Sequence, residues 1–157
     1  MGNSRFRVRL DKGAVKFTLH GVPDRPGMAA EIFDHLHSAG ISVELVVQSA
    51  GSGSKADISL ALLQVDLDHV QQQLQRMQEA KQADRISRDE NVALITLEKE
   101  ELSKTPGVAA RMFRTLAALE INIDLISTSL HSITCLIAEE RADDARRALV
   151  QEFGAEA

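Results

Sequence analysis

The stretch PGMAAEIFDHLHSAGISVELVVQS, residues 26–49, decides the fold because the chain repeats it. Without an insertion or deletion, it recurs 80 residues later as PGVAARMFRTLAALEINIDLISTS, residues 106–129. The two copies share Pro, Gly, an Ala-Ala pair, Phe, Leu, Ile, a second Leu and a final Ser. A fixed internal period indicates repeated structural units. The chain is therefore predicted to be a duplication of two units, each of roughly 75 residues.

The length and composition indicate an ordinary globular protein whose two units depend on each other. A chain of about 150 residues buries roughly 70% of its unfolded surface, whereas one of half that length buries nearer 60%. The two units are therefore expected to fold against each other or against another chain. Of the 157 residues, 44% are apolar and 26% are charged, and no apolar tract approaches the roughly 18 residues of a membrane span.

Charge and cysteine content narrow the function classes and the compartment. The formal net charge of −5 comes from 23 acidic and 18 basic residues with interspersed signs, which argues against an electrostatic binder of nucleic acid. The start MGNSRFRVRL lacks the apolar core of a secretory signal, and the single cysteine, Cys135, has no internal disulfide partner. Both features predict a cytoplasmic protein. Cys135 lies in the apolar run ITCLIA and is expected to be a small buried hydrophobic residue.

Alternating and helical patterns predict the elements that open the first unit. FRVRL, residues 6–10, alternates apolar and charged residues and predicts a short strand that ends in a turn at residues 11–13. A second alternating strand begins at Val15. The segment GVPDRPG then breaks this strand, and an apolar stripe predicts a helix over about residues 26–39 with Asp24 as its N-cap.

The rest of the first unit is predicted to be a hairpin, a helix and a closing strand. Gly40 ends the first helix, and apolar residues alternate from Ile41 to Val47 as in a strand. The loop AGSGSK favours a turn, so the strand DISLALLQV is expected to complete a β-hairpin. Apolar spacings of three and four residues predict a helix over about residues 68–81, and a short strand around Ile86 closes the unit as βαββαβ.

The second unit repeats this order but lacks a fourth strand of its own. Its strands are predicted at residues 92–97, 121–125 and 132–138, with a helix after the first strand and a final helix after the third. The strand at residues 6–10 is expected to fill the vacant place, so that the two units interlock. The predicted domains are residues 14–88 for the first unit and residues 6–10 with 89–153 for the second.

The sequence contains no motif that predicts catalysis or metal binding. It has no Gly-x-x-x-x-Gly-Lys phosphate loop, no Gly-x-Ser-x-Gly nucleophile elbow and no cysteine pair for a metal. His35 and His37 are two residues apart on a predicted helix and point in different directions, while the other histidines lie in separate elements. We therefore expect no catalytic site, no metal and no cofactor in this chain.

The turn PDRPGMAA, residues 23–30, is the best candidate for a binding site. The first amides of a helix have no intrahelical partner and the helix dipole favours an anion, so a carboxylate suits this place. Gly27 has no side chain to block a close approach, and the Asp24 carboxylate can pair with an ammonium group. Together these groups complement a free amino acid. Pro-Gly and Ala-Ala pairs also occur at helix starts for packing reasons alone, and Gln48 and Asn122 can equally be a solvated strand residue and a turn cap.

Three stretches of the chain resemble a known regulatory domain. GVPDRPGMAAEIF, ISVELVVQS and TPGVAARMFRTLAALEINIDLISTS are similar to the paired ACT domains that form the regulatory end of aspartate kinase. The resemblance covers nearly the whole chain, residues 6–153. The 80-residue spacing of the set, the string INIDLISTS and the closing Ala-x-x-x-Leu-x-x-x-Phe pattern make it specific.

The resemblance implies both a fold and a regulatory function. Each unit would be a ferredoxin-like βαββαβ sandwich of class α+β, with helices on one face of an antiparallel sheet, and the two units would interlock. The sheets of two chains would associate into a homodimer. An end-product amino acid, lysine or threonine or both, would bind between ACT units and shift an aspartate kinase catalytic domain toward its inactive state. No kinase domain lies within these 157 residues, so the chain is expected to have no catalytic site of its own.

The residues that would contact the effector follow from the resemblance position by position. The amides of Met28 and Ala29 would bind the carboxylate of the effector. Asp24 would bind its ammonium or a side-chain group, and Gln48 would orient it. The complete set that matches the family's effector contacts is Asp24, Gly27, Met28, Ala29, Gln48, Asn122 and Ile123.

Two departures from the family pattern bear on the ligand. EKEELSKTPG stands where the family has a glycine-containing loop before the second helix, so the effector is expected at the first helix start. Leu130 stands where the family often has an acidic residue, which leaves the identity of the amino acid open.

Two alternatives accompany this interpretation. The first is a freestanding ACT-domain sensor that regulates a different enzyme or partner. The second is RNA binding, because the same βαββαβ topology occurs in RNA-recognition motifs. Such motifs stack bases on strand aromatics, whereas this chain has no Tyr or Trp and four of its five Phe lie on predicted core faces. No nucleic-acid or membrane partner is therefore expected.

Overall fold

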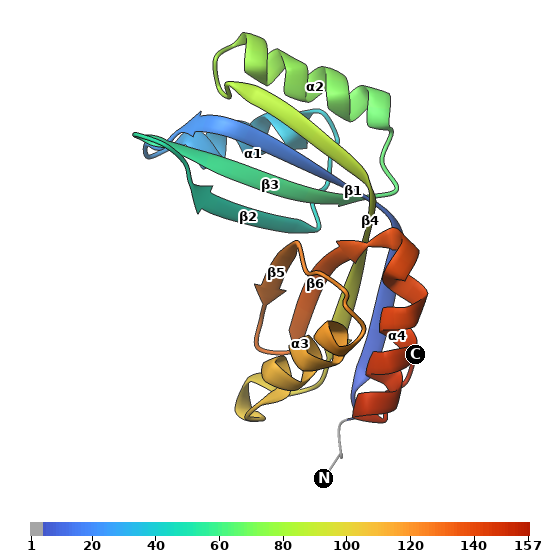
Figure 1. Ribbon diagram of the computed structural model, residues 1–157. Coiled ribbons are helices and arrows are strands. Elements are labelled where there is room, and N and C mark those ends of the chain that lie inside the picture. The colour runs from blue at the N-terminus through green and yellow to red at the C-terminus, as the bar shows by residue number, and fades with distance from the viewer. Residues whose placement is uncertain (1–4) are drawn as a thin grey trace. The chain divides into compact units, whose positions relative to one another are not determined.

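The computed structural model describes residues 5–157 and divides into two compact units (Figure 1). One unit is Ala14–Glu90, and the other combines the described residues up to Gly13 with Asn91–Ala157. The elements in chain order are β1 (Arg7–Pro23), α1 (Met28–Ser38), β2 (Leu45–Ala50), β3 (Lys55–Leu63), α2 (Leu67–Glu79), β4 (Arg85–Glu98), η1 (Leu102–Lys104), α3 (Val108–Ala118), β5 (Leu125–Thr128), β6 (Ser132–Ala138), η2 (Glu139–Arg141) and α4 (Ala142–Phe153). The predicted α+β class is confirmed.

The unit of residues 14–90 is a sheet with two helices on one face. Its strands lie in the order β2-β3-β1-β4, and β3 pairs antiparallel with both β1 and β2. Buried side chains of α1 and α2, such as Ile32 and Leu74, pack in one core with Phe17 and Leu60 of the sheet. The unit therefore has the ferredoxin-like βαββαβ arrangement that the sequence predicts.

The second unit has the same arrangement, with the N-terminal strand in its fourth place. Its strands lie in the order β1-β4-β6-β5, and β6 pairs antiparallel with both β4 and β5. Val8 of β1 belongs to the same core as Ile95 of β4, Met112 of α3 and Leu149 of α4. β1 and β4 each supply strand residues to both units, and this sharing interlocks them.

Two predicted interruptions of the strands are wrong. A turn was expected at residues 11–13, but β1 runs without a break through this segment. Gly13 has a φ of 75°, a backbone conformation that glycine adopts at little cost, so the chain bends locally and continues as a strand. The predicted strands around Ile86 and at 92–97 are likewise one continuous element, β4.

The edge strands β2 and β5 begin later than the alternating pattern predicts. The Ile41 amide donates to the Leu36 carbonyl at 2.9 Å, and the Ile121 amide donates to the Leu116 carbonyl at 3.0 Å. These residues therefore close the ends of the preceding helices instead of starting strands. Gly40, with a φ of 73°, ends the first helix as predicted.

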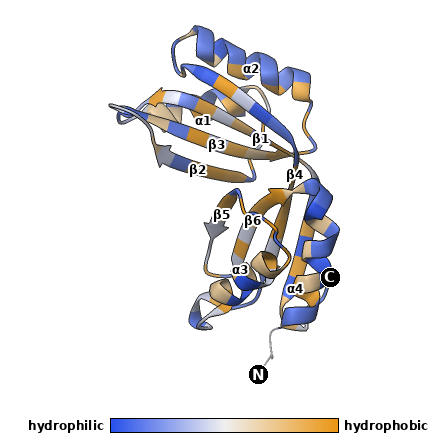
Figure 2. Cartoon of the chain, viewed as in Figure 1, coloured by the Kyte–Doolittle hydropathy of each residue, from blue (hydrophilic) through white to orange (hydrophobic). Residues whose placement is uncertain are grey.

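Two of the helices, α2 and α4, consist largely of polar residues (Figure 2). Figure 2 shows mostly hydrophilic residues along α2 and α4, with hydrophobic residues concentrated on the strands. Among residues 5–157, no helix is long and apolar enough to cross a membrane.

Candidate functional site

A pocket of about 400 Å³ lies at the start of α1, where β1, the following loop and β2 meet. It brings together five of the seven predicted effector contacts. Its lining residues are Val22, Pro23, Asp24, Arg25, Pro26, Gly27, Met28, Ala29, Gln48, Ala56 and Ile58.

The helix start at this pocket has no side-chain cap. The N-cap residue is Gly27, whose φ of 94° favours glycine, and no side chain bonds to the first helical amides. The prediction of Asp24 as the N-cap is wrong, because the left-handed turn at Gly27 starts the helix three residues later. By contrast, the Asp66 side chain caps α2 by accepting a hydrogen bond from the His69 amide at 3.2 Å. The amides at the start of α1 are thus left without the side-chain partner that α2 has.

Two amides of α1 can donate to a ligand, and a third is already engaged. Within the described residues, the amides of Ala29 and Ala30 make no hydrogen bond. The Met28 amide donates to the Arg25 carbonyl at 3.3 Å, so its predicted role as a ligand donor would require this bond to open. The anion-binding capacity of the helix start therefore rests on Ala29 and Ala30 together with the helix dipole.

Within the described part of the chain, the pocket has one carboxylate without an ion-pair partner and one arginine that is already paired. The Asp24 amide donates to the Ser54 carbonyl at 2.8 Å, which ties the loop to the β2–β3 hairpin. Among the described residues, the Asp24 carboxylate has no ion-pair partner. The Arg25 guanidinium instead pairs with Glu31 at 3.2 Å. An ammonium group entering the pocket thus finds one carboxylate that is not neutralised.

Strand register places Gln48 on the helix side of the sheet. Gln48 of β2 lies directly opposite Ile58 of β3, and Ile58 belongs to the core beneath α1. Residues opposite each other in an antiparallel pair share a face, so the Gln48 side chain lies on the side of α1 and lines the pocket.

The remaining two predicted contacts do not line this pocket. Asn122 is exposed and Ile123 is half-buried, in the segment between α3 and β5 of the other unit. Ile123 packs against the core of that unit. Their predicted role as effector contacts rests on the family resemblance alone.

A second pocket, of about 500 Å³, lies at the corresponding start of α3. Gly107, with a φ of 79°, begins this helix, again without a side-chain cap. The residues lining the pocket are apolar or carry hydroxyl groups, and none is charged: Leu102, Ser103, Thr105, Pro106, Gly107, Val108, Ala109, Ala110, Thr128, Ser129 and Ile133. The duplication therefore preserved the hollow and changed the chemistry of its wall.

Sequence reasoning missed several residues of the first pocket. Arg25 stands inside the quoted turn, and its position between two prolines was the only available signal. Ala56 and Ile58 lie on β3, and Ile58 could have been found by pairing the predicted hairpin strands from the loop outward. Val22 and Pro23 reach the pocket because of an irregularity in β1 that the sequence pattern does not reveal.

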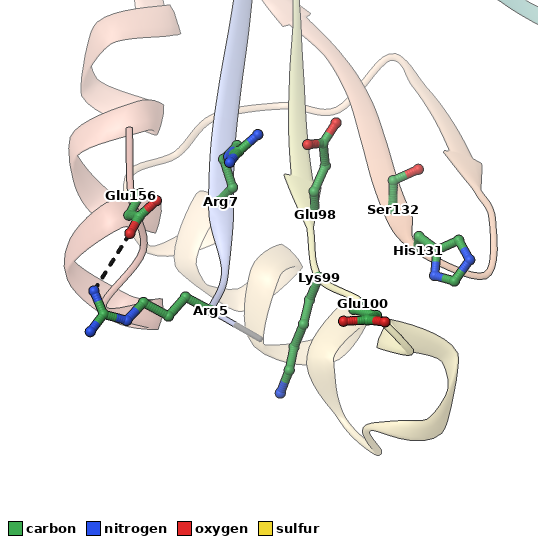
Figure 3. Close-up of a pocket in the computed structure, with 8 residues that line it drawn as sticks. All are labelled: Arg5, Arg7, Glu98, Lys99, Glu100, His131, Ser132 and Glu156. Atoms are coloured by element: carbon green, nitrogen blue, oxygen red, sulfur yellow. Dashed lines mark ion pairs between the residues drawn. The ribbon is translucent and has the colours of Figure 1, made fainter. Parts of the chain in front are cut away.

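A third hollow, of about 410 Å³, lies near the start of β1 and has a charged wall (Figure 3). Two of its three carboxylates pair with arginines: Glu156 with Arg5 at 3.5 Å, and Glu98 with Arg9 at 2.7 Å. Figure 3 shows the side chains of Arg5, Arg7 and Lys99 pointing in different directions. These cations therefore do not converge on one ligand position.

The described residues offer no reactive thiol and no metal site. Burial raises the pKa of the Cys135 thiol from 9.0 to about 12, so this thiol stays protonated at neutral pH. Across residues 5–157, no three His, Cys, Asp or Glu side chains lie close enough to hold a metal ion. Cys135 packs in the core of its unit, as the apolar run around it predicts.

Comparison with family models assigns both units to one class of regulatory domain. A family model described as ACT domain matches residues 18–78 and 95–153. The chain belongs to the ACT domain family.

Two curated relatives of the chain are aspartokinases. The chain is 36% identical over 142 residues to the aspartokinase of Helicobacter pylori, and 31% identical over 148 residues to that of Thermus thermophilus. These alignments cover 90% and 93% of this chain but only 35% and 36% of the relatives. The chain thus spans about a third of the length of these curated relatives.

Two solved structures of similar length are also aspartokinase subunits. One, described as aspartokinase alpha and beta subunits, is 31% identical with a TM-score of 0.85, covering 94% of this chain and 97% of that one. The ligand-free regulatory subunit of aspartate kinase from Thermus thermophilus is 30% identical with a TM-score of 0.81, covering 93% of this chain and 96% of that one. The chain is homologous to regulatory subunits of aspartate kinase.

Proposed function

We propose that this chain is a regulatory module of aspartate kinase that binds an end-product amino acid at the start of α1. The observation that carries the proposal is the single pocket that unites Asp24, Gly27, Met28, Ala29 and Gln48. The chain would bind the effector and change the activity of a catalytic domain that its own residues do not provide. Its two ACT domains are proposed at residues 14–88 and at 6–10 with 89–153, in the cytoplasm.

The chemistry of the pocket complements both charged groups of a free amino acid. The uncapped start of α1 offers the Ala29 amide and the helix dipole to the carboxylate. The Asp24 carboxylate accepts the ammonium group, and the Gln48 amide hydrogen-bonds the side chain of the effector. Lysine and threonine are the proposed ligand class, with Asn122 and Ile123 completing the site from a second ACT unit.

Open sheet edges support the proposed homodimer. β2 and β5 are edge strands of their respective sheets, and each carries a large apolar side chain that is 45% exposed, Val46 and Ile126. The outer edge of β1 is covered by Glu156, whose carbonyl accepts from the Val8 amide at 2.8 Å and whose amide donates to the Phe6 carbonyl at 3.0 Å. A second copy of the chain is therefore proposed to pair along β2 and β5, the two end strands of the sheet order.

A thermal-shift screen against the twenty amino acids tests the proposal. A ligand present at about 100 times its Kd should stabilise the fold by about 2.7 kcal/mol, which appears as a rise in Tm. Asp24→Ala should make the shift clearly smaller, whereas Asp34→Ala, which removes an exposed carboxylate on α1 outside the pocket, should leave it intact. The absence of a shift with every amino acid would exclude effector binding by the isolated chain.

The partner enzyme requires a separate experiment. Adding the chain to an aspartate kinase catalytic subunit is expected to make its activity sensitive to the amino acid found in the screen. Co-purification of the two chains would support the same conclusion. Binding of an amino acid without any effect on that catalytic subunit would favour a freestanding ACT sensor for another partner.

A further inference from the structure

The last residues of β1 before the pocket contain a β-bulge. The β4–β6 pairing of the second unit has no such bulge. From Ala14 to Leu19, β1 pairs with β3 in a constant register, and Leu19 lies opposite Ile58. Beyond the irregularity, Val22 lies opposite Ala56, so two residues of β1 face the single residue Asp57. One extra residue in a strand reverses which side chains face the core.

Because of this reversal, the side chain of Val22 in the pocket wall lies on the α1 side of the sheet. Regular alternation from Leu19 would place Val22 on the helix-free face of the sheet. Because of the bulge, Val22 is instead 1% exposed within the core beneath α1, and it lines the pocket with Pro23 and Asp24. The bulge therefore determines which side of the sheet the pocket loop starts from.

The Asp57 side chain holds the bulge in place from the neighbouring strand. Its Oδ1 accepts a hydrogen bond from the Gly21 amide at 3.0 Å, and its Oδ2 lies 3.6 Å from Nδ1 of His20. His20 in turn bonds through Nε2 to Oγ of Ser87 at 2.8 Å. The extra residue of β1 thus has a side-chain partner for the amide that the strand ladder leaves unpaired.

The backbone of Gly21 admits no ordinary side chain. Its φ is 69°, and a Cβ added there would lie 2.2 Å from a carboxylate oxygen of Asp84. Asp84 is itself fixed, because its amide donates to the His20 carbonyl at 2.8 Å and its carboxylate pairs with Lys55 at 2.7 Å. The bulge is therefore a built feature that β3 and the segment before β4 clamp from two directions.

We infer that Asp57 is a positioning residue for the pocket at α1, acting through the Gly21 bulge. It touches no ligand, since it lies on the helix-free face and does not line the pocket. Its hydrogen bond to Gly21 sets the course of Val22–Asp24 and so the position of the Asp24 carboxylate relative to the start of α1. The ligand-binding part of this inference rests on the proposed function.

Three variants of Asp57 separate positioning from charge. Asp57→Asn keeps an oxygen that can accept from Gly21, Asp57→Ala removes it, and Asp57→Ser holds its oxygen one bond shorter. The probes are L-lysine and L-threonine, titrated by calorimetry into the full chain. Asp57→Ala and Asp57→Ser should weaken binding about tenfold, and Asp57→Asn by less than about twofold.

A matched position in the second unit provides the control. Ser132 of β6 lies opposite Glu98 in a β4–β6 register that has no irregularity. Ser132→Ala should therefore leave the affinity for either probe unchanged. Wild-type affinity in Asp57→Ala, or equal losses in Asp57→Ala and Asp57→Asn, would overturn the positioning role.

A measurement without ligand keeps this inference distinct from the proposed function. Amide hydrogen exchange of Gly21 and Asp24 in the free protein should accelerate about tenfold in Asp57→Ala and stay at the wild-type rate in Asp57→Asn. If neither probe binds the wild type, the proposed effector fails while the exchange result still decides the role of Asp57. Unchanged exchange in Asp57→Ala and Asp57→Ser would refute it.

Discussion

The two pockets lie at the starts of α1 and α3, which are copies of one repeated helix. The chain reaches the two helices by different connections. The first is reached by the short connection at residues 24–27, after a bulged strand. The second is reached by residues 99–107, which contain η1, after a strand without a bulge. The second connection is anchored to the β5–β6 turn by the Ser103 amide, which donates to the Leu130 carbonyl at 3.1 Å. The two copies of the helix start are therefore preceded by differently built connections.

Side chains at matching positions show what the duplication kept. Ile32 and Met112 are both fully buried in their cores, as are Leu36 and Leu116 one helical turn later. By contrast, Asp24 corresponds to Lys104, which pairs with Glu101 at 2.6 Å. The core positions kept their apolar character while the position that offers a carboxylate reversed its charge.

Contacts between the helices diverged in the same manner. In the first unit, His35 bonds to Gln73 at 2.9 Å, and His69 bonds to the Ala39 carbonyl at 2.8 Å. In the second unit, Arg111 donates to the Glu152 carbonyl at 3.0 Å and Arg141 donates to the Leu119 carbonyl at 2.9 Å. Polar side-chain bonds join each pair of helices, although the residues differ. Similar packing is therefore compatible with unrelated polar chemistry.

The largest expected effect concerns the equivalence of the two cores. Ile32→Ala and Met112→Ala should each lower the free energy of unfolding by about 3 kcal/mol, because each leaves a cavity in a buried cluster. Since β1 and β4 belong to both units, either substitution should shift one common transition in thermal unfolding. Leu130→Ala, at a side chain 67% exposed, should change stability by less than about 0.5 kcal/mol. Two separate transitions would show that the cores fold independently.

Exchange of the charge-reversed pair tests the difference between the pockets. Asp24→Lys should weaken amino-acid binding about thirtyfold, because it replaces the proposed ammonium partner with a like charge. Lys104→Asp, the reciprocal change, should leave binding at the first pocket unchanged. Calorimetric titration with L-lysine and L-threonine measures both. An affinity lost equally in the two variants would place the ligand outside the pocket at α1.

The two N-cap glycines should behave alike in stability and differently in binding. Gly27→Ala and Gly107→Ala force a side chain into left-handed backbone, with φ of 94° and 79°, and should each cost about 1–2 kcal/mol. No backbone atom crowds an added Cβ at either glycine, so the loss reflects conformation. Chemical denaturation measures this loss. Only Gly27→Ala should also weaken amino-acid binding, and an equal effect of Gly107→Ala would contradict a single site.

The smallest expected effect concerns Cys135, which occupies the place of Leu60 in the duplicated core. Burial raises its pKa from 9.0 to about 12. Above pH 9 the thiol ionises in the unfolded chain and stays protonated in the folded one, so stability falls as pH rises. Between pH 8 and pH 10 the loss should be on the order of 1 kcal/mol. Urea unfolding of Cys135→Ala should lack this component, and identical pH profiles would refute it.

Most of the fold could be predicted because local patterns and packing agree. The apolar stripes of the helices and the alternation in the sheet strands specify faces as well as elements. The N-terminal strand was placed by counting strands, since a βαββα unit leaves one position vacant. The failures at residues 11–13 and at Asp24 have one cause, namely that a glycine with positive φ can bend a strand or start a helix without an ordinary turn or cap.

The candidate site was predictable to the extent that it is contiguous in sequence. Asp24, Gly27, Met28 and Ala29 lie within one turn, and Gln48 lies on the strand of the same repeat. Val22 could not be assigned to the pocket, because a bulge is a property of two paired strands and the spacing within one strand does not record it. The Ala30 amide is free to donate and the Met28 amide is already hydrogen-bonded. Both states likewise depend on loop geometry.

The short backbone pairing between Glu156 and the start of β1 covers one strand edge. An uncovered strand edge offers unpaired amides and carbonyls with which another chain can pair. Deletion of residues 154–157 would uncover this edge of β1 at Phe6 and Val8. A few residues after α4 therefore shield a strand edge that could otherwise pair with another chain.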